Sequence, residues 1–138
     1  MANTINKSVT YWDGTRGALH YVLSSDGTAL SDLQLLDISA LGGAPSAIKI
    51  RTISITMWGN FILTFEWDAT TDTTIEIFET QTADVSQSFI MDYTDFPGGV
   101  PVVLADKTAA GFTGDVLVTS SGLASGDGFS LYMTFERD

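Results

Sequence analysis

Residues 111–138, GFTGDVLVTSSGLASGDGFSLYMTFERD, decide the fold class of this chain. In the second half of this stretch every other residue is apolar, at Phe129, Leu131, Met133 and Phe135. Because successive side chains of a β-strand point to opposite faces, this alternation predicts a half-buried strand over residues 129–136. Residues 115–119 predict a second strand, and a turn-rich loop of Ser, Gly, Ala and Asp joins the two. We therefore expect mostly antiparallel sheet.

The same kind of pattern continues through the rest of the chain. Alternating, aromatic or β-branched runs predict further strands over residues 17–24, 29–39, 47–58, 61–67, 73–79, 85–92 and 100–104. Short strands about ten residues apart, without a sustained helical period, are typical of a β-sandwich or barrel. We predict an all-β fold, an antiparallel and jelly-roll-like β-sandwich over residues 11–138, which follows a short, polar and flexible N-terminal arm over residues 1–10.

Two changes of phase predict irregular points in the sheet. After Leu33 and Leu35, the apolar positions shift by one residue to Leu36 and Ile38, which indicates a bulge or a bend. A second shift of the same kind requires one extra residue near positions 51–52. In both places one strand then has one residue more than its partner.

Residues 47–65 are interpreted as a hairpin. A three-residue loop over positions 58–60 places Met57 opposite Phe61 and keeps one apolar face throughout, whereas a two-residue loop mixes the two faces. The longer loop also puts Asn60 where a left-handed backbone is needed, which Asn tolerates. We therefore predict the three-residue loop.

Composition limits the classes of partner. The chain has 138 residues, enough for one domain with its own core, and the lack of cysteine excludes disulfides, Cys-ligated metals and thiol catalysis. Six Lys and Arg residues against 17 Asp and Glu residues give a net charge of −11. This charge repels phosphate backbones and anionic lipids, so we expect no direct nucleic-acid contact and no membrane partner. The first ten residues are polar, so we expect no export signal.

No pattern in the sequence indicates catalysis. His20 is the single histidine, and its phase within residues 17–24 places it away from the apolar face. Glu66 and Asp68 share a strand face at a spacing that suits a glycosidase pair, but any alternating strand supplies such a pair. We interpret them as part of a solvated polar face. We therefore expect no catalytic residue and no enzyme.

Two acidic loops offer oxygen atoms of the kind that Ca²⁺ prefers. They are Asp68 with Asp72, and residues 125–128, SGDG. Neither has the ligand spacing of an EF-hand, and Asp beside Gly is mainly a turn signal. We expect turns at both places, with no metal and no cofactor.

Large aromatic side chains are the candidates for partner contact. Trp67 is in phase with Phe65 and is expected in the core. Trp58 lies at the tip of the predicted hairpin, and Trp12 follows Tyr11 near the N-terminus. Because Trp and Tyr contribute a large share of interface energy, we predict partner contacts at Tyr11, Trp12 and Trp58. Local packing is the alternative role for Trp12 and Trp58.

Two segments of the chain resemble small virion proteins of tailed bacteriophages, especially marine ones. They are residues 61–74, FILTFEWDATTDTT, and residues 109–136. In that group, a strand ending in EWDATTD precedes a Gly-rich region, an A-x-G-[FY]-T-G-D-[IV] element and a final G-D-x-[FY] strand. The corresponding residues here are 66–72, 109–116 and 126–129. The resemblance covers less than half of the chain and includes no catalytic motif.

The resemblance implies a structural role in a virion. It suggests a capsid decoration or cement protein, assembled in the host cytoplasm, that binds the major capsid protein on the capsid exterior. A homo-oligomer such as a trimer would bridge capsid subunits through several weak contacts at once, with the N-terminal arm as the segment that reaches a neighbour. One alternative is a tail, head–tail connector or fibre-associated virion protein. Another is a carbohydrate-binding β-sandwich module that uses Trp12 or Trp58.

Overall fold

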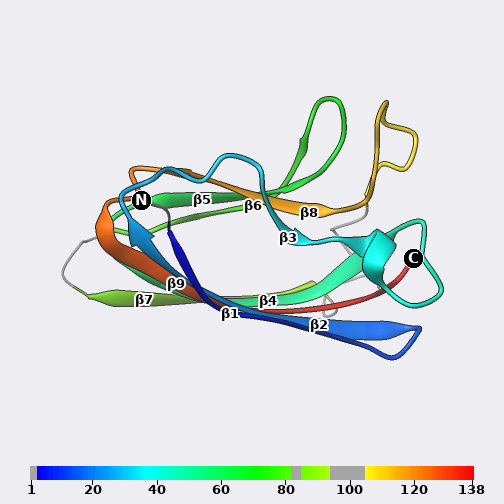
Figure 1. Cartoon of the computed structure of the whole chain (residues 1–138), viewed down its shortest axis with the longest axis horizontal. Coiled ribbons are helices and arrows are strands. Elements are labelled where there is room, and N and C mark those ends of the chain that lie inside the picture. The colour runs from blue at the N-terminus through cyan, green and yellow to red at the C-terminus, as the bar shows by residue number, and fades with distance from the viewer. Residues whose placement is uncertain (1–2, 82–84, 94–104) are drawn as a thin grey trace.

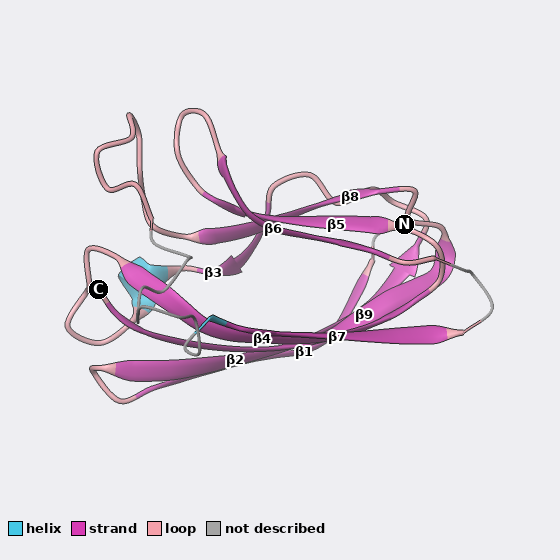
Figure 2. Cartoon of the chain, turned by 180° about the vertical axis from the view of Figure 1, so that it is seen from behind, coloured by secondary structure: helices cyan, strands magenta, loops and turns pink. Residues whose placement is uncertain are grey.

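The protein folds into two β-sheets packed face to face. The computed structural model describes residues 3–81, 85–93 and 105–138, and Figure 1 and Figure 2 show its two layers from opposite sides. The strands are β1 (Thr4–Trp12), β2 (Arg16–Asp26), β3 (Leu33–Leu36), β4 (Ile48–Trp58), β5 (Ile62–Trp67), β6 (Thr73–Glu79), β7 (Ser86–Asp92), β8 (Val116–Ser121) and β9 (Ser125–Arg137). A short 3₁₀ helix, η1 (Ile38–Ala40), follows β3. No helix in the described part of the chain has the length and apolarity needed to span a membrane.

The chain crosses repeatedly between the two sheets. The five-stranded sheet has the order β1-β2-β9-β4-β7, and the four-stranded sheet has the order β3-β8-β5-β6. All neighbouring strands run antiparallel. Apart from the added β1, each sheet has four strands, and consecutive strands from β2 to β5 alternate between the sheets, as in a jelly roll. The predicted all-β, jelly-roll-like β-sandwich is confirmed.

One apolar core fills the space between the sheets. The inward residues predicted for β9 are all fully buried, at Phe129, Leu131, Met133 and Phe135. From the four-stranded sheet, β5 contributes Leu63, Phe65 and Trp67 to the same cluster. Each large apolar side chain buried in this way stabilises the fold by about 1.5–3 kcal/mol. The alternation in β9 therefore identifies the side of the strand that holds the sandwich together.

Strand β4 has the predicted bulge, but it is not half of a hairpin. Its register against β9 shifts between Ile50 and Thr52, which makes Arg51 the extra residue. The expected pairing of Met57 with Phe61 is wrong, because β4 pairs with β7 and β9 whereas β5 pairs with β6 and β8. Both side chains are buried, but they enter the core from opposite sheets. Alternation shows which face of a strand is buried and does not show which strand lies beside it.

The bulge predicted near residues 35–36 is also present. The register of β3 against β8 shifts between Gln34 and Leu36. Leu35 and Leu36 are consecutive residues, and both are buried. A regular strand would have exposed one of them.

The segment predicted as a flexible arm is largely an edge strand. β1 begins at Thr4 and pairs with β2 as far as Trp12, which lies opposite Gly17. Its polar residues suit this position, because an edge strand needs a backbone partner on one side only and leaves its side chains in water. Residues 1–2 and the predicted strand over residues 100–104 lie outside the described residues.

Candidate functional site

The outer face of the five-stranded sheet is the candidate binding surface. Directly opposed residues of antiparallel strands point to the same face, so the strand registers define rows of side chains across the sheet. From β1 to β7, one row consists of Tyr11, Ala18, Thr134, Thr52 and Asp92. The next row consists of Val9, His20, Tyr132, Ser54 and Ile90. We refer to this surface as the contact face.

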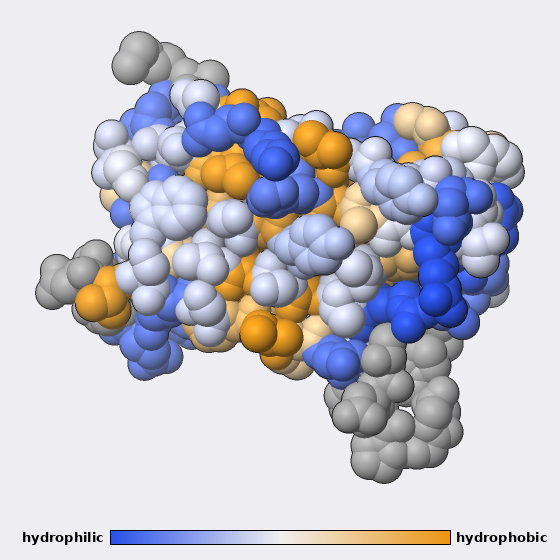
Figure 3. Space-filling view, turned by 90° about the horizontal axis from the view of Figure 1, so that it is seen from below, coloured by the Kyte–Doolittle hydropathy of each residue, from blue (hydrophilic) through white to orange (hydrophobic). Residues whose placement is uncertain are grey.

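Apolar side chains are exposed across the whole width of the contact face. The exposed fractions are 64% for Tyr11 on β1, 49% for Tyr132 on β9 and 76% for Ile90 on β7. Figure 3 views the molecule from the side of this sheet, and it shows apolar side chains among others of intermediate hydropathy over the middle, with a band of strongly hydrophilic ones along one margin. An exposed apolar surface with a polar rim is typical of an interaction site.

A groove of about 470 Å³ lies within the contact face. The exposed rings of Tyr11 and Tyr132 stand at its rim, and the smaller Ala18 and Thr134 line the space between them. Arg16 and Arg51 line its charged end. The groove therefore combines aromatic rings, a small-residue floor and positive charge.

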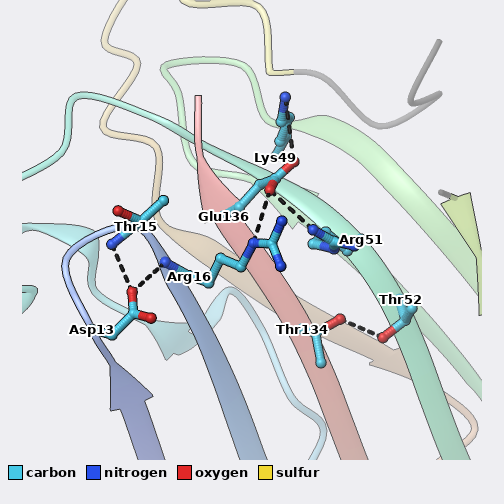
Figure 4. Close-up of polar contacts among 8 residues, drawn as sticks. All are labelled: Asp13, Thr15, Arg16, Lys49, Arg51, Thr52, Thr134 and Glu136. Carbon is cyan, nitrogen blue, oxygen red and sulfur yellow. Dashed lines mark hydrogen bonds and ion pairs between the residues drawn. The ribbon is translucent and has the colours of Figure 1, made fainter. Parts of the chain in front are cut away.

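Three cations share one carboxylate at the charged end of the groove (Figure 4). Glu136 lies 3.6 Å from Arg16 Nε, 3.3 Å from Lys49 Nζ and 3.1 Å from Arg51 Nη1. Burial raises the pKa of Glu136, but the neighbouring Lys49 and Arg51 outweigh burial and hold this pKa below its ordinary value. These four residues together carry two net positive charges at neutral pH, and the Asp13 carboxylate next to Arg16 offsets part of this surplus. We refer to these four residues as the cation cluster.

Two cations of β4 and the residue after its bulge lie on the outer side of the sheet. Lys49 lies opposite Glu136 and Thr52 lies opposite Thr134, so both point outward. Arg51, the extra residue between them, also reaches the outer side, where its guanidinium contacts Glu136. In a regular strand, Arg51 would share the face of Lys49, two residues before it, and Thr52 would point to the core. The extra residue at the bulge therefore lets Thr52 point outward next to the two cations.

Two of the predicted contact residues, Tyr11 and Trp12, are neighbours with different environments. Tyr11 is exposed and lines the groove. Trp12 points to the other side of β1, where its ring stacks on Phe135 with the ring centroids 5.8 Å apart. Its indole Nε1 also donates a hydrogen bond to the Gly42 carbonyl oxygen at 2.8 Å. Trp12 therefore has the local packing role that the sequence left open, and partner contact at both residues stays a prediction.

The third predicted contact residue, Trp58, lies at the end of the contact face farthest from the cation cluster. It is directly opposite Gly128 on β9. A Cβ atom at position 128 would lie 2.6 Å from the indole ring, so the missing side chain lets the ring lie against the backbone. Trp58 is half-buried in this position. Its contact with a partner also stays a prediction.

His20 is in the centre of the contact face, where the sequence placed it on the polar side of its strand. Its imidazole meets the Tyr132 ring edge-on, with the centroids 6.3 Å apart. Val9 lies on its other side in the same row. His20 therefore packs between neighbouring side chains of the contact face.

Three carboxylates gather on the four-stranded side of the molecule. One oxygen atom from each of Asp32, Glu66 and Asp72 lies within 4.8 Å of the others. The sequence had associated Asp68 with Glu66 and Asp72, whereas the structure brings in Asp32, which no spacing signal had identified. Asp32 accepts a hydrogen bond from Thr119 Oγ1, and Asp72 accepts one from a backbone N–H in its own turn. These carboxylates are partly or fully exposed, and Asp32 and Asp72 have hydrogen-bond partners within the protein, so we assign no metal role to them.

The turn predicted over residues 125–128 is wrong, because these residues form the start of β9, where its register against β2 shifts between Ser24 and Asp26. Asp127 accepts a hydrogen bond from the Ala124 backbone N–H at 2.9 Å. Its carboxylate also occupies the place where a side chain at Gly59 would lie, and Gly59 has a φ of 113° that favours glycine. Asp127 thus connects the loop before β9 with the turn after β4.

Residues 66–72 and residues 109–116 are hydrogen-bonded to each other. The Thr70 N–H donates to the Ala110 carbonyl at 2.8 Å, and the Asp68 N–H donates to the Asp115 carbonyl at 3.0 Å. The Thr113 hydroxyl donates to the Asp68 carboxylate at 2.7 Å. Two elements that are distant in sequence therefore form one joined pair of loops next to β5 and β8. These loops belong to the scaffold, and their residues do not line the groove.

Most of the contact face is not evident from the sequence. Tyr11 and Trp58 are predicted there as large aromatic residues, and Tyr132 carries a further signal, because it alternates with the buried residues of β9 and so has to face outward. Arg16, Arg51 and Ile90 become its neighbours only through the strand order, since they come from three other strands. No pattern within a single strand contains that information.

Comparison with known proteins gives a likeness of fold alone. No protein-family model and no curated protein matches the chain. Among solved structures, the chain is similar to "Carbohydrate binding module family29", with 9% identity, coverage of 97% of this chain and 76% of that chain, and a TM-score of 0.33. It is also similar to "BiXyn10A CBM1 APO", with 12% identity, coverage of 98% and 92%, and a TM-score of 0.36. At such TM-scores, neither likeness bears on what this chain binds.

Proposed function

We propose that this protein is a non-enzymatic structural protein of a tailed-bacteriophage virion, a decoration protein that binds the major capsid protein on the capsid exterior. The observation that carries the proposal is the contact face, with Tyr11, Tyr132 and Ile90 exposed across its width. Exposed apolar residues of this extent favour a protein–protein contact. The resemblance of residues 66–72 and 109–116 to phage virion proteins supports the same class of function.

The structure is compatible with attachment in many copies. A net charge of −11 keeps free copies apart in solution. At the edge of the five-stranded sheet, β1 has one side without a neighbouring strand in the described fold, and its free backbone groups suit pairing with a capsid subunit or a second copy. An oligomer that engages several capsid subunits at once turns weak contacts into a stable bridge.

Two matched substitutions test the proposal. Ile90→Asp places a charge on the contact face, whereas Ile77→Asp places one on β6 of the other sheet. The wild-type side chains are 76% and 55% exposed, so both variants are expected to fold. With capsids assembled without this protein, wild type and Ile77→Asp are expected to bind and to raise the heat resistance of the particles. Ile90→Asp is expected to bind about tenfold more weakly.

Two results would contradict the proposal. The first is wild-type protein that neither binds such capsids nor changes their heat resistance. The second is equal binding by the two variants, since the contact face would then not be the attachment surface. If a tagged form of the protein is found only at one vertex or on the tail of the particles, the tail, connector or fibre alternative is favoured.

The tyrosine rings at the groove favour a carbohydrate-binding module as a second candidate. Aromatic rings in a groove with a few polar groups are a common form of small-ligand site. In that case a glycan array is expected to show binding by wild type and loss of binding in Tyr132→Ala. Trp12→Ala is a poor test of this candidate, because Trp12 packs on Phe135.

A further inference from the structure

The basic residues are unevenly distributed over the two sheets. Strands β3, β5, β6 and β8 of the four-stranded sheet contain no Lys or Arg. The contact face has Arg16, Lys49 and Arg51 at one end, and Lys7 lies opposite the outward Val22 farther along β1. Four of the six basic residues of an acidic chain therefore lie on one surface.

The cation cluster has donors left for a ligand. A guanidinium group has five N–H donors, and the ion pairs with Glu136 involve one nitrogen each of Arg16 and Arg51. Both arginines line the groove, and the Arg16 side chain is 65% exposed. Paired N–H groups of an arginine match the two oxygens of a carboxylate. Since one carboxylate is shared by three cations, a second anionic group would complete the cluster.

The rest of the groove suits apolar groups better than sugar hydroxyls. The Thr52 and Thr134 hydroxyls are hydrogen-bonded to each other at 2.5 Å, so neither is a fully free partner for a polyol. The rim rings, Tyr11 and Tyr132, offer apolar area next to the cations. Along the strands, the surface thus changes from cationic to aromatic within neighbouring rows. A peptide that has acidic residues next to apolar ones is complementary to this order.

Nucleic acid fits this site poorly. A phosphate backbone is a continuous line of negative charge, and beyond the cluster it would meet a chain of net charge −11. Charges separated by more than about 10 Å are largely screened at moderate salt, so a ligand with a few carboxylates responds mainly to the cluster itself. A short acidic segment therefore gains the local attraction without the long-range repulsion.

We propose that the groove on the contact face recognises an acidic, extended polypeptide segment, in which carboxylates meet Arg16 and Arg51 and adjacent apolar side chains lie between Tyr11 and Tyr132. The inference rests on the proposed function, because it identifies the chemistry of the capsid segment that the contact face binds. Charge complementarity gives such a contact its specificity and its association rate.

A titration with defined probes tests the inference. The first probe is the blocked peptide Glu-Glu-Glu-Leu-Tyr-Leu, and its neutral counterpart has Gln in place of each Glu. Oligogalacturonate supplies the same carboxylates on a sugar backbone. We expect the Glu peptide to bind about tenfold more tightly than either of the other two, and added salt to reduce the difference.

Protein variants locate the site. The double variant Arg16→Ala, Arg51→Ala is expected to lose about tenfold in affinity for the Glu peptide. Lys107→Ala removes one positive charge at a residue that is paired with Asp138 and does not line the groove, and it is expected to change the affinity by less than about twofold. Glu136→Gln is expected to bind the Glu peptide more tightly. A circular-dichroism spectrum like that of wild type is the control for folding in each variant.

The possible outcomes separate this inference from the proposed function. Equal losses in Arg16→Ala, Arg51→Ala and in Lys107→Ala would overturn the inference, and so would tighter binding of oligogalacturonate than of the Glu peptide. If undecorated capsids bind wild type and the arginine variant equally, the inference fails while the capsid role stands. If wild type binds the Glu peptide selectively but does not bind capsids, the capsid role fails while the groove assignment stands.

Discussion

The two outer surfaces of the sandwich differ in charge and in exposed chemistry. The strands of the four-stranded sheet carry Glu66, Glu76 and Glu79 and no basic residue. The contact face carries a cation cluster with a surplus of positive charge and exposes tyrosine rings beside it. A net charge of −11 therefore averages over two unlike surfaces. The net negative charge disfavours polyanionic partners such as nucleic acids. The cation cluster attracts an anionic group that comes within about 10 Å of it, the screening length at moderate salt.

The largest expected effect comes from removing the support beneath the contact face. Phe135 is fully buried, stacks with Trp12 and lines the groove from below. Phe135→Ala is expected to lower the free energy of unfolding by about 3–5 kcal/mol, because it leaves a cavity in a packed core. The measurement is urea unfolding followed by circular dichroism. The preceding residue, Thr134, points outward. Thr134→Ala is expected to lower the free energy of unfolding by about 1 kcal/mol, because it removes the hydrogen bond with Thr52. Similar losses for the two variants would contradict the assignment of faces.

A buried carboxylate next to the four-stranded sheet gives the second effect. Asp115 accepts hydrogen bonds from the Ile38 backbone N–H and from Gln34 Nε2, both at 2.9 Å. Asp115→Ala leaves both donors without this partner and is expected to cost about 1–3 kcal/mol. Asp115→Asn keeps an acceptor for Ile38 and can pair with a rotated Gln34 amide, so it is expected to cost less than half as much. Thermal unfolding of the two variants at one pH makes the comparison.

The pH dependence of Asp115 adds a sign to this prediction. Burial raises its pKa above the ordinary value, and Asp37 and Asp68 raise it further, although its hydrogen bonds oppose this. Between the ordinary pKa and the raised one, the folded state holds a proton that the unfolded state has lost, so this group's contribution to stability falls as pH rises. Asp115→Asn is expected to remove that fall. If the difference in unfolding free energy between wild type and Asp115→Asn stays constant across this pH range, the raised pKa of Asp115 is contradicted.

Much of this contrast between surfaces was predictable within strands, but not between them. The alternation of β9 predicted that Leu131 is buried and that Tyr132 is not, and the apolar phase predicted the β4 bulge near Arg51. The hairpin prediction failed because an inward residue looks the same in sequence whether its neighbour lies beside it or across the core. Tyr11 and Tyr132 come from opposite ends of the chain. They line one groove because the strand order places β1 and β9 on either side of β2 in the same sheet. The site depends on strand order, which single-strand patterns do not contain.

Glu136, on the contact face, has a pKa shift opposite in direction to that of Asp115. Burial raises its pKa, but Lys49 and Arg51 lower it to below the ordinary value, so its contribution to stability is present at neutral pH and is lost as pH falls from the ordinary pKa through the lowered one. Glu136→Gln is expected to cost about 1 kcal/mol or less at neutral pH, since the cluster is partly exposed to solvent. Unfolding curves recorded across the acid range are expected to show the loss shrinking at low pH. A loss that grows on acidification would contradict the lowered pKa.

The smallest expected effect comes from the carboxylates on the other side. Asp32, Glu66 and Asp72 hold like charges within 4.8 Å of one another, and Coulomb repulsion in a water-like medium is worth only about 1 kcal/mol at such a distance. Glu66→Gln is therefore expected to stabilise the fold by about 0.5 kcal/mol at low salt. The gain is expected to vanish near 1 M salt, where the screening length is about 3 Å.

The matched control for this prediction is Glu79→Gln, which removes the same charge from the same sheet but at an exposed position outside the trio. If relief of local repulsion is the cause, Glu66→Gln gains more than Glu79→Gln in chemical unfolding at low salt. If both gain equally, the effect belongs to the net charge of the whole chain. If Glu66→Gln instead lowers the free energy of unfolding, and if removal of Ca²⁺ lowers that of the wild type by the same amount, the three carboxylates bind a cation. One surface of the sandwich would then bind a cation and the other an anionic partner.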